Sequence, residues 1–454
     1  MMPDFTIEEV VEAVQGTVLK KGANTFSAVV TDTRKISKGA LFIALKGENF
    51  DGHDFVERAI ENGAQGVVVS RVDGVPQLDH LKVTMIKVED TLVAYQQLAK
   101  AYRNRFSIPI IAITGSNGKT TTKDLTAAIL SSKFNVLKTE ANFNNEIGLP
   151  LTLFQLTQEH DVAVVEMGMR GFDQIRQLTK VALPTIGIVT NVGETHMELL
   201  GSIENIALAK SELVEEISAE GLVILNGDNP YVKSMATKAK GKVIFFGLGA
   251  DCTIKAENVE ITGKSTAFTC NFANKQERFV LPMVGRHNVY NALGAIAVAQ
   301  YLHLTADDVR RGLRDFSASG MRLAIEEIGS YIVINDAYNA SPMSMNAAIE
   351  ALQEVAKKRS IAVLGDMLEL GDAAETAHRN VGKKLVATKV DVVIAIGEMA
   401  KWVIEEADKG GIVAIHCENH AEAGKRLKER LQPEDTILFK GSRGMKMEKV
   451  IDLL

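Results

Sequence analysis

The chain has 454 residues, of which 46% are hydrophobic and 24% charged, and its formal net charge is -6. This length exceeds one ordinary core, and the composition is that of a folded globular protein rather than a disordered one. The negative net charge gives no sign of the basic surface that nucleic acid would need, so we expect no nucleic-acid partner. Three widely spaced cysteines without a CxxC pair argue against a disulfide framework and against a zinc site.

The amino-terminal segment carries no signal for export or membrane insertion. It is acidic and amphipathic, with no basic stretch followed by an apolar one. No window of the chain approaches the roughly eighteen uncharged apolar residues of a membrane-spanning helix. We therefore expect a cytoplasmic protein that is not embedded in a membrane.

Residues 1–85 mix short β-rich runs with helical stretches. The runs at 28–31, 41–44 and 66–69 predict strands, and residues 55–62 predict a helix. This zone is predicted to be a small α/β domain.

Residues 86–315 have a different hydrophobic pattern, in which a predicted helix over 92–106 is followed by continuous apolar runs. These runs are 108–114, 161–167, 185–191 and 221–226. Because they are continuous rather than alternating, we expect strands covered on both faces, in a largely parallel sheet. The polar, threonine-rich stretch 251–280 predicts antiparallel strands or an insertion.

Residues 316–454 again alternate predicted strands with helices, after a boundary marked by the small residues at 317–320. The predicted strands are 331–336, 360–366, 390–397 and 435–441, and the predicted helices are 344–358 and 373–387. Strand–helix units of this kind build doubly wound nucleotide-binding domains. The sequence thus predicts an α/β protein of three domains: 1–85, a central P-loop ATPase-like domain at 86–315, and a Rossmann-like domain at 316–454.

The stretch GSNGKTT, residues 115–121, has most features of a nucleotide-phosphate loop but not its usual spacing. The common P-loop has a glycine five positions before its Gly-Lys pair, and here Ile113 stands there. A buried strand followed by two glycines and a helix would still place backbone N–H groups at a helix N-terminus, where anions are stabilised. Lys119 offers a charge to the β- and γ-phosphates, and Thr120 a hydroxyl to Mg²⁺. The alternative is an ordinary strand-to-helix turn with a solvated lysine.

Polar residues also follow two other predicted strands. Glu166 follows the apolar residues of the run 161–167 and precedes a glycine-containing turn. A metal-holding carboxylate is expected at such a strand end. His196 follows the run 185–191, close to Asn191 and Glu194. A lone histidine there fits either a ligand of the site or a structural residue.

Six motifs in this order resemble the Mur ligase family, the ATP-dependent amide-bond formers of bacterial cell-wall precursor synthesis. They are GSNGKTT (115–121), EMGMRG (166–171), NVGETHME (191–198), AKSEL (209–213), GRHNVYNALGA (285–295) and NDAYNASP (335–342). The loop that departs from the common P-loop matches the shortened form of this family.

Within the family, the stretches 31–55, 364–371 and 439–448 resemble the member that adds D-alanyl-D-alanine to UDP-MurNAc-tripeptide. The resemblance implies an ATP-dependent peptide ligase that acts through an acyl phosphate and gives UDP-MurNAc-pentapeptide, ADP and phosphate. It implies ATP and two Mg²⁺ ions, and we expect a monomer.

Other enzymes remain as alternatives. The ligase that adds the third amino acid is expected to carry an Asp-(Asn/Asp)-Pro-Arg motif, which is absent after residue 320. A folylpolyglutamate-type synthase would lack the uridine motif at 31–55. From a different class, a P-loop phosphotransferase would carry the full GxxxxGK[ST] spacing.

Roles of the catalytic residues follow from the resemblance. Lys119 is expected to contact the β- and γ-phosphates, Thr120 a first Mg²⁺, and Glu166 to share in metal binding. His196 is expected to hold a second Mg²⁺, and Lys210 to be carbamylated by CO₂. By its local pattern alone, Lys210 fits a solvent-facing lysine of a helix.

The nucleotide and substrate sites also follow from the resemblance. The phosphate loop comprises Gly115, Ser116, Asn117, Gly118, Lys119, Thr120 and Thr121. Asn288 and Asn291 are expected to contact adenine, Arg322 the ATP phosphates and Asp336 the ribose, with Tyr338 and Asn339 near adenine or the dipeptide. Asp32, Thr33, Arg34, Lys46 and Gly47 are expected at the uridine diphosphate, and Asn142, Asn144 and Asn145 at the muramoyl peptide. The three asparagines equally fit a capped turn.

Overall fold

The structure is a computed structural model that describes residues 4–47, 49–73, 82–317 and 320–454. The chain packs as two compact units, one of residues 1–112, 134–168 and 174–185, the other of 113–133, 169–173 and 186–454. The small residues predicted to mark the second boundary include 318–319, which lie outside the described residues.

The amino-terminal part of the first unit is built on a five-stranded sheet. Its strands, in spatial order, are β2 (Thr17–Lys20), β7 (Thr84–Lys87), β6 (Gly66–Val69), β5 (Leu41–Ile43) and β4 (Val29–Val30). All neighbouring pairs are parallel except β2–β7. Helix α2 (Val56–Glu61) packs Val56 and Ala59 against Phe42 and Val67 of the sheet. The prediction of a small α/β domain is confirmed here.

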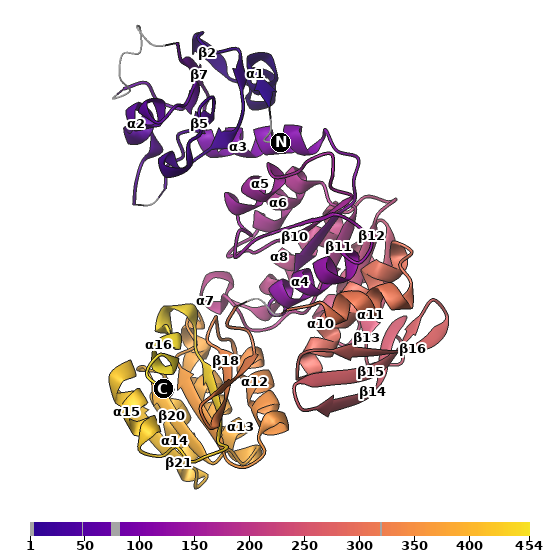
Figure 1. Cartoon of the computed structure of the whole chain (residues 1–454), viewed down its shortest axis with the longest axis vertical. Helices are drawn as coiled ribbons and strands as arrows, with labels where there is room; N and C mark the ends of the chain where they lie inside the picture. The colour runs from indigo at the N-terminus through magenta and orange to yellow at the C-terminus, as the bar shows by residue number, and fades with distance from the viewer. Residues whose placement is uncertain (1–3, 48, 74–81, 318–319) are drawn as a thin grey trace. The chain divides into compact units, whose positions relative to one another are not determined.

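The central sheet is drawn in Figure 1, and its strand β8 (Ile110–Thr114) is buried along its whole length. Its strand order is β16-β15-β14-β13-β12-β11-β8-β10-β9. The other strands are β9 (Val136–Lys138), β10 (Val162–Glu166), β11 (Ile186–Val189), β12 (Leu222–Asn226), β13 (Lys242–Gly247), β14 (Ile254–Thr262), β15 (Ser265–Phe272) and β16 (Lys275–Leu281). The pairs from β11 to β14 and β9–β10 are parallel, and β14–β15–β16 are antiparallel. Both expectations, a largely parallel sheet and antiparallel strands at 251–280, are confirmed.

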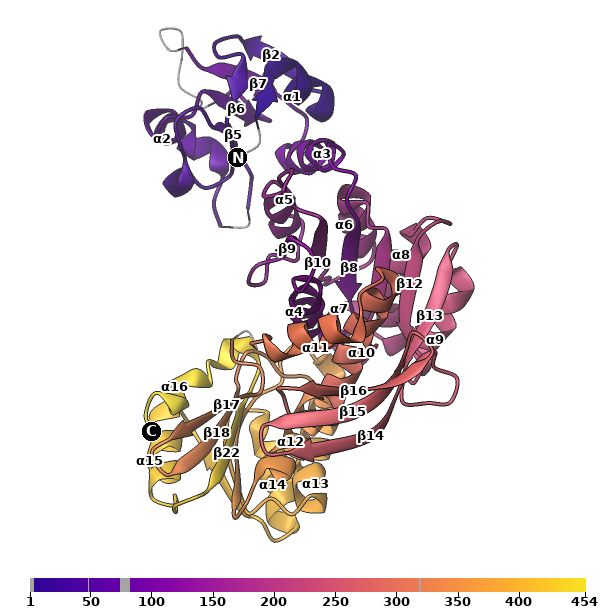
Figure 2. The same ribbon diagram turned by 45° about the vertical axis from the view of Figure 1, so that its right-hand side comes forward.

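Helices α4 (Lys119–Leu130), α10 (Arg286–Tyr301) and α11 (Ala306–Arg314) lie together in the second unit (Figure 2). Helix α10 is apolar on nearly all sides and is therefore buried along most of its length. A Cβ at Gly312 would lie 2.4 Å from the Cα of Ile129, so glycine permits the close approach of α11 to α4. Helix α11 thus packs against the last turn of α4, while α10 meets its first turn, where Thr122 Oγ1 donates to Asn291 Oδ1 at 3.3 Å.

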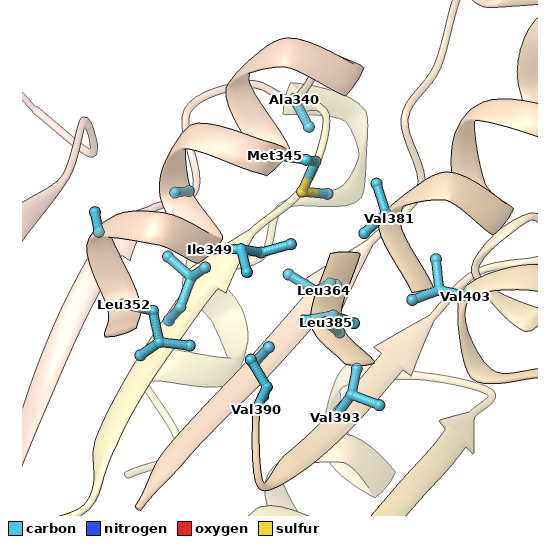
Figure 3. Close-up of a cluster of buried hydrophobic side chains, with 14 of the residues drawn as sticks. Ala340, Met345, Ile349, Leu352, Leu364, Val381, Leu385, Val390, Val393 and Val403 are labelled. Carbon is cyan, nitrogen blue, oxygen red and sulfur yellow. The ribbon is translucent and has the colours of Figure 1, made fainter. Parts of the chain in front are cut away.

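The carboxyl-terminal part is a six-stranded sheet covered by helices. In spatial order its strands are β17 (Ala324–Ile328), β18 (Tyr331–Asp336), β22 (Thr436–Lys440), β19 (Ser360–Gly365), β20 (Val392–Ile396) and β21 (Val413–Cys417). Only β17–β18 is antiparallel. Figure 3 shows one face of its core, where Met345, Ile349 and Leu352 of α12 (Pro342–Val355) lie near Leu364, and Val381 and Leu385 come from α13 (Ala374–Ala387). The prediction of an alternating, Rossmann-like region is confirmed.

Two further observations bear on the class of protein. No helix among the described residues has the length and apolar character needed to cross a membrane. Cys252, Cys270 and Cys417 are buried and free. None of these three cysteines therefore forms a disulfide in this structure.

Candidate active site

The phosphate-loop candidate joins β8 to α4. Gly118 precedes the helix with φ 80°, in the left-handed region that glycine adopts without a Cβ clash. A Cβ at Gly115 would lie 1.9 Å from Thr190 Oγ1, so the loop can pass this point only as glycine. The loop ends at a helix N-terminus whose backbone N–H groups stabilise anions.

Side chains from the segment after β11 brace this loop. Asn191 Nδ2 donates to the backbone oxygen of Asn117, and Asn191 Oδ1 accepts from the Asn117 N–H, both at 2.9 Å. Ser116 Oγ donates to the Gly193 oxygen at 3.0 Å and accepts from the Gly193 N–H at 2.9 Å. Ser341, at the start of α12, donates to Asn117 Oδ1 at 2.9 Å. The backbone of Ser116 and Asn117 is therefore preorganised.

Lys119 lies over its own loop. Its ammonium donates to the backbone oxygens of Gly115 at 2.7 Å and Ser116 at 3.2 Å. Thr120 is buried and Thr121 half-buried on the first turn of α4. A lysine held on the loop in this way is positioned to meet a phosphate, which a freely solvated lysine is not.

Lys210 lies inside the protein on helix α8 (Ile203–Glu216), with 2% of its surface exposed. Burial holds the pKa of Lys210 well below its usual value, and the nearby ammonium of Lys119 lowers that pKa further. Within residues 4–47, 49–73, 82–317 and 320–454, no hydrogen bond or ion pair to the Lys210 ammonium is present. The interpretation of Lys210 as a solvent-facing lysine is wrong, because its helix face packs inward.

His196 precedes the short helix α7 (Met197–Leu200). Its Nδ1 lies 2.6 Å from Glu369 Oε2. Burial lowers the pKa of His196; Glu369 opposes this effect, and the charges of Lys210 and Lys119 reinforce it. The influence of both lysines on the histidine shows that the structure brings Lys119, Lys210 and His196 into one region.

Glu166 belongs to the first unit, where it ends β10 and is 2% exposed. Asn144 Nδ2 donates to Glu166 Oε1 at 2.7 Å, and the Glu166 N–H donates to Thr139 Oγ1 at 3.1 Å. A buried carboxylate oriented by an amide has a fixed direction, as a metal ligand requires.

The other asparagines of this segment differ from Asn144. Asn145 Oδ1 accepts from the N–H groups of Ile147 at 3.3 Å and Gly148 at 2.9 Å, which is a capped turn. Asn142 is exposed.

Asn288 and Asn291 are both buried on α10. Asn288 Nδ2 donates to the Val284 oxygen at 2.8 Å, and Asn291 Nδ2 donates to Asn288 Oδ1 at 3.0 Å. Asn291 Oδ1 accepts from Thr122 Oγ1 at 3.3 Å and lies beneath the loop, 2.3 Å from where a Cβ on Gly118 would be. In this structure these amides bond within the protein and tie α10 to α4.

The four predicted residues of the carboxyl-terminal part are held by two sets of contacts. The Arg322 guanidinium lies 3.9 Å from the ring centroid of Tyr338. The Lys440 ammonium donates to Asp336 Oδ2 at 2.5 Å and to the Asn339 oxygen at 2.8 Å. The buried lysine therefore joins Asp336 to Asn339, while Arg322 packs against Tyr338.

The predicted uridine-diphosphate residues all lie in the first unit. Arg34 donates two hydrogen bonds to Asp32, from Nε to Oδ1 at 2.9 Å and from a terminal nitrogen to Oδ2 at 2.8 Å. Through these bonds, the Arg34 guanidinium lowers the pKa of Asp32 to about 2. Lys46 is exposed, and the Gly47 N–H donates to the Phe50 oxygen at 2.9 Å. Thr33 begins the 3-10 turn that Asp32 caps.

Sequence reasoning assigned no role to Lys440, Glu369 or Ser341. Lys440 and Glu369 stand in the stretches 439–448 and 364–371, and Ser341 in the motif 335–342. All three residues therefore lie in motifs that the sequence analysis had identified. Their roles could not be predicted, because the contacts that define them join distant parts of the chain.

Comparisons with known proteins agree over the whole chain. Three family models match: Mur ligase family, catalytic domain (residues 25–103), Mur ligase middle domain (113–299) and Mur ligase, glutamate ligase domain (321–443). The chain is 40% identical to UDP-N-acetylmuramoyl-tripeptide–D-alanyl-D-alanine ligase of Bacillus subtilis (strain 168), covering 98% of this chain and 97% of the relative.

Two crystal structures extend the comparison. A crystal structure of MurF from Acinetobacter baumannii is similar to this chain with a TM-score of 0.92 and 31% identity. The similarity covers 100% of this chain and 99% of that one. A crystal structure of MurF ligase from Thermotoga maritima in complex with ADP is similar with a TM-score of 0.85 and 27% identity. The similarity covers 94% of this chain and 96% of that one. Both likenesses span the three sheets described above.

Proposed function

Because the chain belongs to the Mur ligase family, we propose that it is an ATP-dependent peptide ligase that joins D-alanyl-D-alanine to UDP-MurNAc-tripeptide. The products are UDP-MurNAc-pentapeptide, ADP and phosphate, and the pathway is peptidoglycan precursor synthesis. The observation that carries the proposal is the near-complete coverage of a relative with that name at 40% identity. The proposal assigns residues 1–85 to the UDP substrate, 86–315 to ATP and 316–454 to ligation, in a monomer of the cytoplasm.

The chemistry sets what the site has to do. A carboxylate is a poor electrophile because its charge is shared by two oxygens. Transfer of the ATP γ-phosphoryl group to one oxygen makes an acyl phosphate. The amine of D-alanyl-D-alanine then attacks the carbonyl carbon, loses a proton, and expels phosphate. The protein must therefore hold several anions together and neutralise charge as it develops.

The braced loop from Gly115 to Thr121 would bind the β- and γ-phosphates, and Lys119 would supply a positive charge to them. Its ammonium now bonds to backbone oxygens at 2.7 and 3.2 Å, and a phosphate would replace those weaker acceptors. Asn288 and Asn291 would serve the adenine side, Arg322 the phosphates and Asp336 the ribose, with Tyr338 and Asn339 beside them.

The residues present fit Mg²⁺ bound together with a nucleotide. Among the described residues, no group of three or more His, Cys, Asp and Glu side chains could hold a metal ion alone. Mg²⁺ is usually held through one or two protein ligands, waters and substrate phosphates. Thr120, Glu166 and His196 would supply the protein ligands of two ions. When bound, Mg²⁺ would supply positive charge to the phosphoryl group in transfer.

Lys210 is proposed to be carbamylated. The free amine, not the ammonium, attacks CO₂, giving a carbamate and releasing one proton. Burial already favours the free amine at Lys210, and the product is an anion beside the ammonium of Lys119. The carbamate would thus be paired where the ammonium is not. A ¹³C NMR carbamate signal from ¹³CO₂ that is lost in Lys210→Arg tests this role.

The peptide substrate would bind to the first unit. Asp32, Thr33, Arg34, Lys46 and Gly47 are proposed at the uridine diphosphate. Asn142, Asn144 and Asn145 are proposed at the muramoyl peptide, and Asn144 would also orient Glu166 through its 2.7 Å bond.

Mass spectrometry of the reaction products tests the function. The enzyme is mixed with ATP, Mg²⁺, D-alanyl-D-alanine and UDP-MurNAc-tripeptide carrying either L-lysine or meso-diaminopimelate. We expect pentapeptide from at least one tripeptide and none from Lys119→Ala. Addition of an amino acid to a UDP-MurNAc-dipeptide instead would identify a third-residue ligase. Phosphate release that needs neither peptide substrate would identify a different class of P-loop enzyme.

A further inference from the structure

The segment from Asp366 to Gly371 meets the loop that carries His196 at three points. Glu369 Oε2 lies 2.6 Å from His196 Nδ1, and the Glu198 N–H donates to the Glu369 oxygen at 3.3 Å. A Cβ on Gly371 would lie 3.3 Å from the Glu198 Cα, so the two backbones are in close contact. Backbone and side-chain contacts together make this a docked pair of loops rather than an isolated surface ion pair.

Both residues of the pair have an unusual backbone conformation. His196 has φ 56° and Glu369 has φ 62°, in the left-handed region. This region costs an L-residue with a Cβ about 1–2 kcal/mol, and such residues gather at functional sites. Each follows the carboxyl end of a parallel strand, β11 for His196 and β19 for Glu369. Ligands of open α/β sheets bind at these ends.

The pair contributes little to stability. The side chain of His196 is 27% exposed and that of Glu369 is 44% exposed. Ion pairs with this exposure stabilise a fold by about 0–1 kcal/mol, which does not offset two left-handed residues. The contact is therefore better explained by what it does to the imidazole ring.

We propose that Glu369 is a positioning residue that fixes the tautomer and direction of the His196 ring. A neutral imidazole has one N–H donor and one acceptor nitrogen. A carboxylate at Nδ1 makes that nitrogen the donor and leaves Nε2 with its lone pair for a ligand. Glu369, a residue of the carboxyl-terminal part, thus orients a histidine of the central part. The inference rests on the proposed function in that the ligand of Nε2 is Mg²⁺.

The first readout uses the protein without metal or nucleotide. In ¹⁵N-histidine-labelled protein at neutral pH, the His196 signals are identified by their loss in His196→Asn. We expect a protonated Nδ1 and an unprotonated Nε2 in the wild type. In Glu369→Ala we expect the Nε2–H tautomer to appear. Glu369→Gln, whose amide oxygen can still accept the Nδ1–H, should keep the wild-type tautomer.

The second readout is the Mg²⁺ concentration that gives half-maximal ligation. We expect Glu369→Ala to raise it roughly 10–100-fold, as loss of an orienting partner does, and Glu369→Gln to raise it less. The matched control is Glu375→Gln, which removes the carboxylate of an exposed ion pair with Arg379, 2.8 Å long, and should leave both readouts unchanged.

Two results would overturn the inference: an Nε2–H tautomer in the wild type, or a Glu369→Ala variant that matches Glu375→Gln in both readouts. Failure of the proposed function has a different signature. In that case no variant ligates the substrates, yet the tautomer measurement still shows whether Glu369 orients His196.

Discussion

Replacing Lys440 by methionine should strongly destabilise the carboxyl-terminal sheet. The Lys440 side chain is 2% exposed and that of its partner Asp336 is 13% exposed. Methionine preserves most of the side-chain volume and removes the ammonium. Among the described residues, the carboxylate of Asp336 then keeps the bond from the Leu323 N–H, 3.1 Å long, and the Asn339 oxygen loses its lysine donor.

The magnitude follows from the burial of the pair. Removing one partner of a buried ion pair costs about 3–5 kcal/mol, because an uncompensated charge stays behind. Since Asp336 is slightly exposed and keeps one bond, we expect the lower end, about 3 kcal/mol. Asp336→Asn added to Lys440→Met removes the unpaired charge, so the double variant should recover about 1–2 kcal/mol.

Urea unfolding followed by tryptophan fluorescence measures this effect. Trp402 is the single tryptophan of the chain, and it lies on α14 (Ala400–Lys409) of the same region, 6.1 Å from the ring centroid of His378. Lys384→Met is the control, because it removes an exposed ion pair with Glu350 and should cost about 1 kcal/mol or less. An unfolding free energy of Lys440→Met within about 1 kcal/mol of wild type would refute the reasoning.

Three further predictions concern the phosphate loop, the buried His287 and domain closure. Gly118→Ala should weaken binding of an ATP analogue at least tenfold by calorimetry, since its Cβ meets Asn291 Oδ1; Gly263→Ala, which also has positive φ but no atom within 4 Å, should not. Burial lowers the pKa of His287 to about 4, so the unfolded chain binds more protons and stability should fall as pH drops from about 6.5 to 4; in His287→Gln, acid unfolding curves should show a smaller decrease. Because Lys119 and Asp336 would serve one ATP, small-angle scattering should show compaction with an ATP analogue and both substrates, and an unchanged radius would count against that geometry.

The strands and the phosphate loop were predictable because their signals are local. Continuous apolar runs predicted β8, β10, β11 and β12, and two glycines before Lys119 predicted the turn into α4. The edge strand β21 was not predicted, because most of its residues are exposed or half-exposed and the apolar run is interrupted by His416.

The residues that organise the site were not predictable in the same way. Lys440 pairs with Asp336, 104 positions away, because β22 lies beside β18 in register. The residues next to Lys440 in the sequence do not indicate that this lysine, at the end of a strand, is buried. The contact of Glu369 with His196 spans 173 positions and depends on two loops meeting. The inward direction of Lys210 likewise depends on what its helix packs against, which the helical pattern alone does not specify.

The most direct test of carboxylate activation follows an oxygen atom. The reacting carboxylate of UDP-MurNAc-tripeptide is labelled with ¹⁸O and incubated with the enzyme, ATP, Mg²⁺ and D-alanyl-D-alanine. An acyl phosphate requires one carboxylate oxygen to leave with the phosphoryl group, so the phosphate released should carry one ¹⁸O and the new amide should keep the other. Phosphate without ¹⁸O, formed together with pentapeptide, would contradict the acyl-phosphate account.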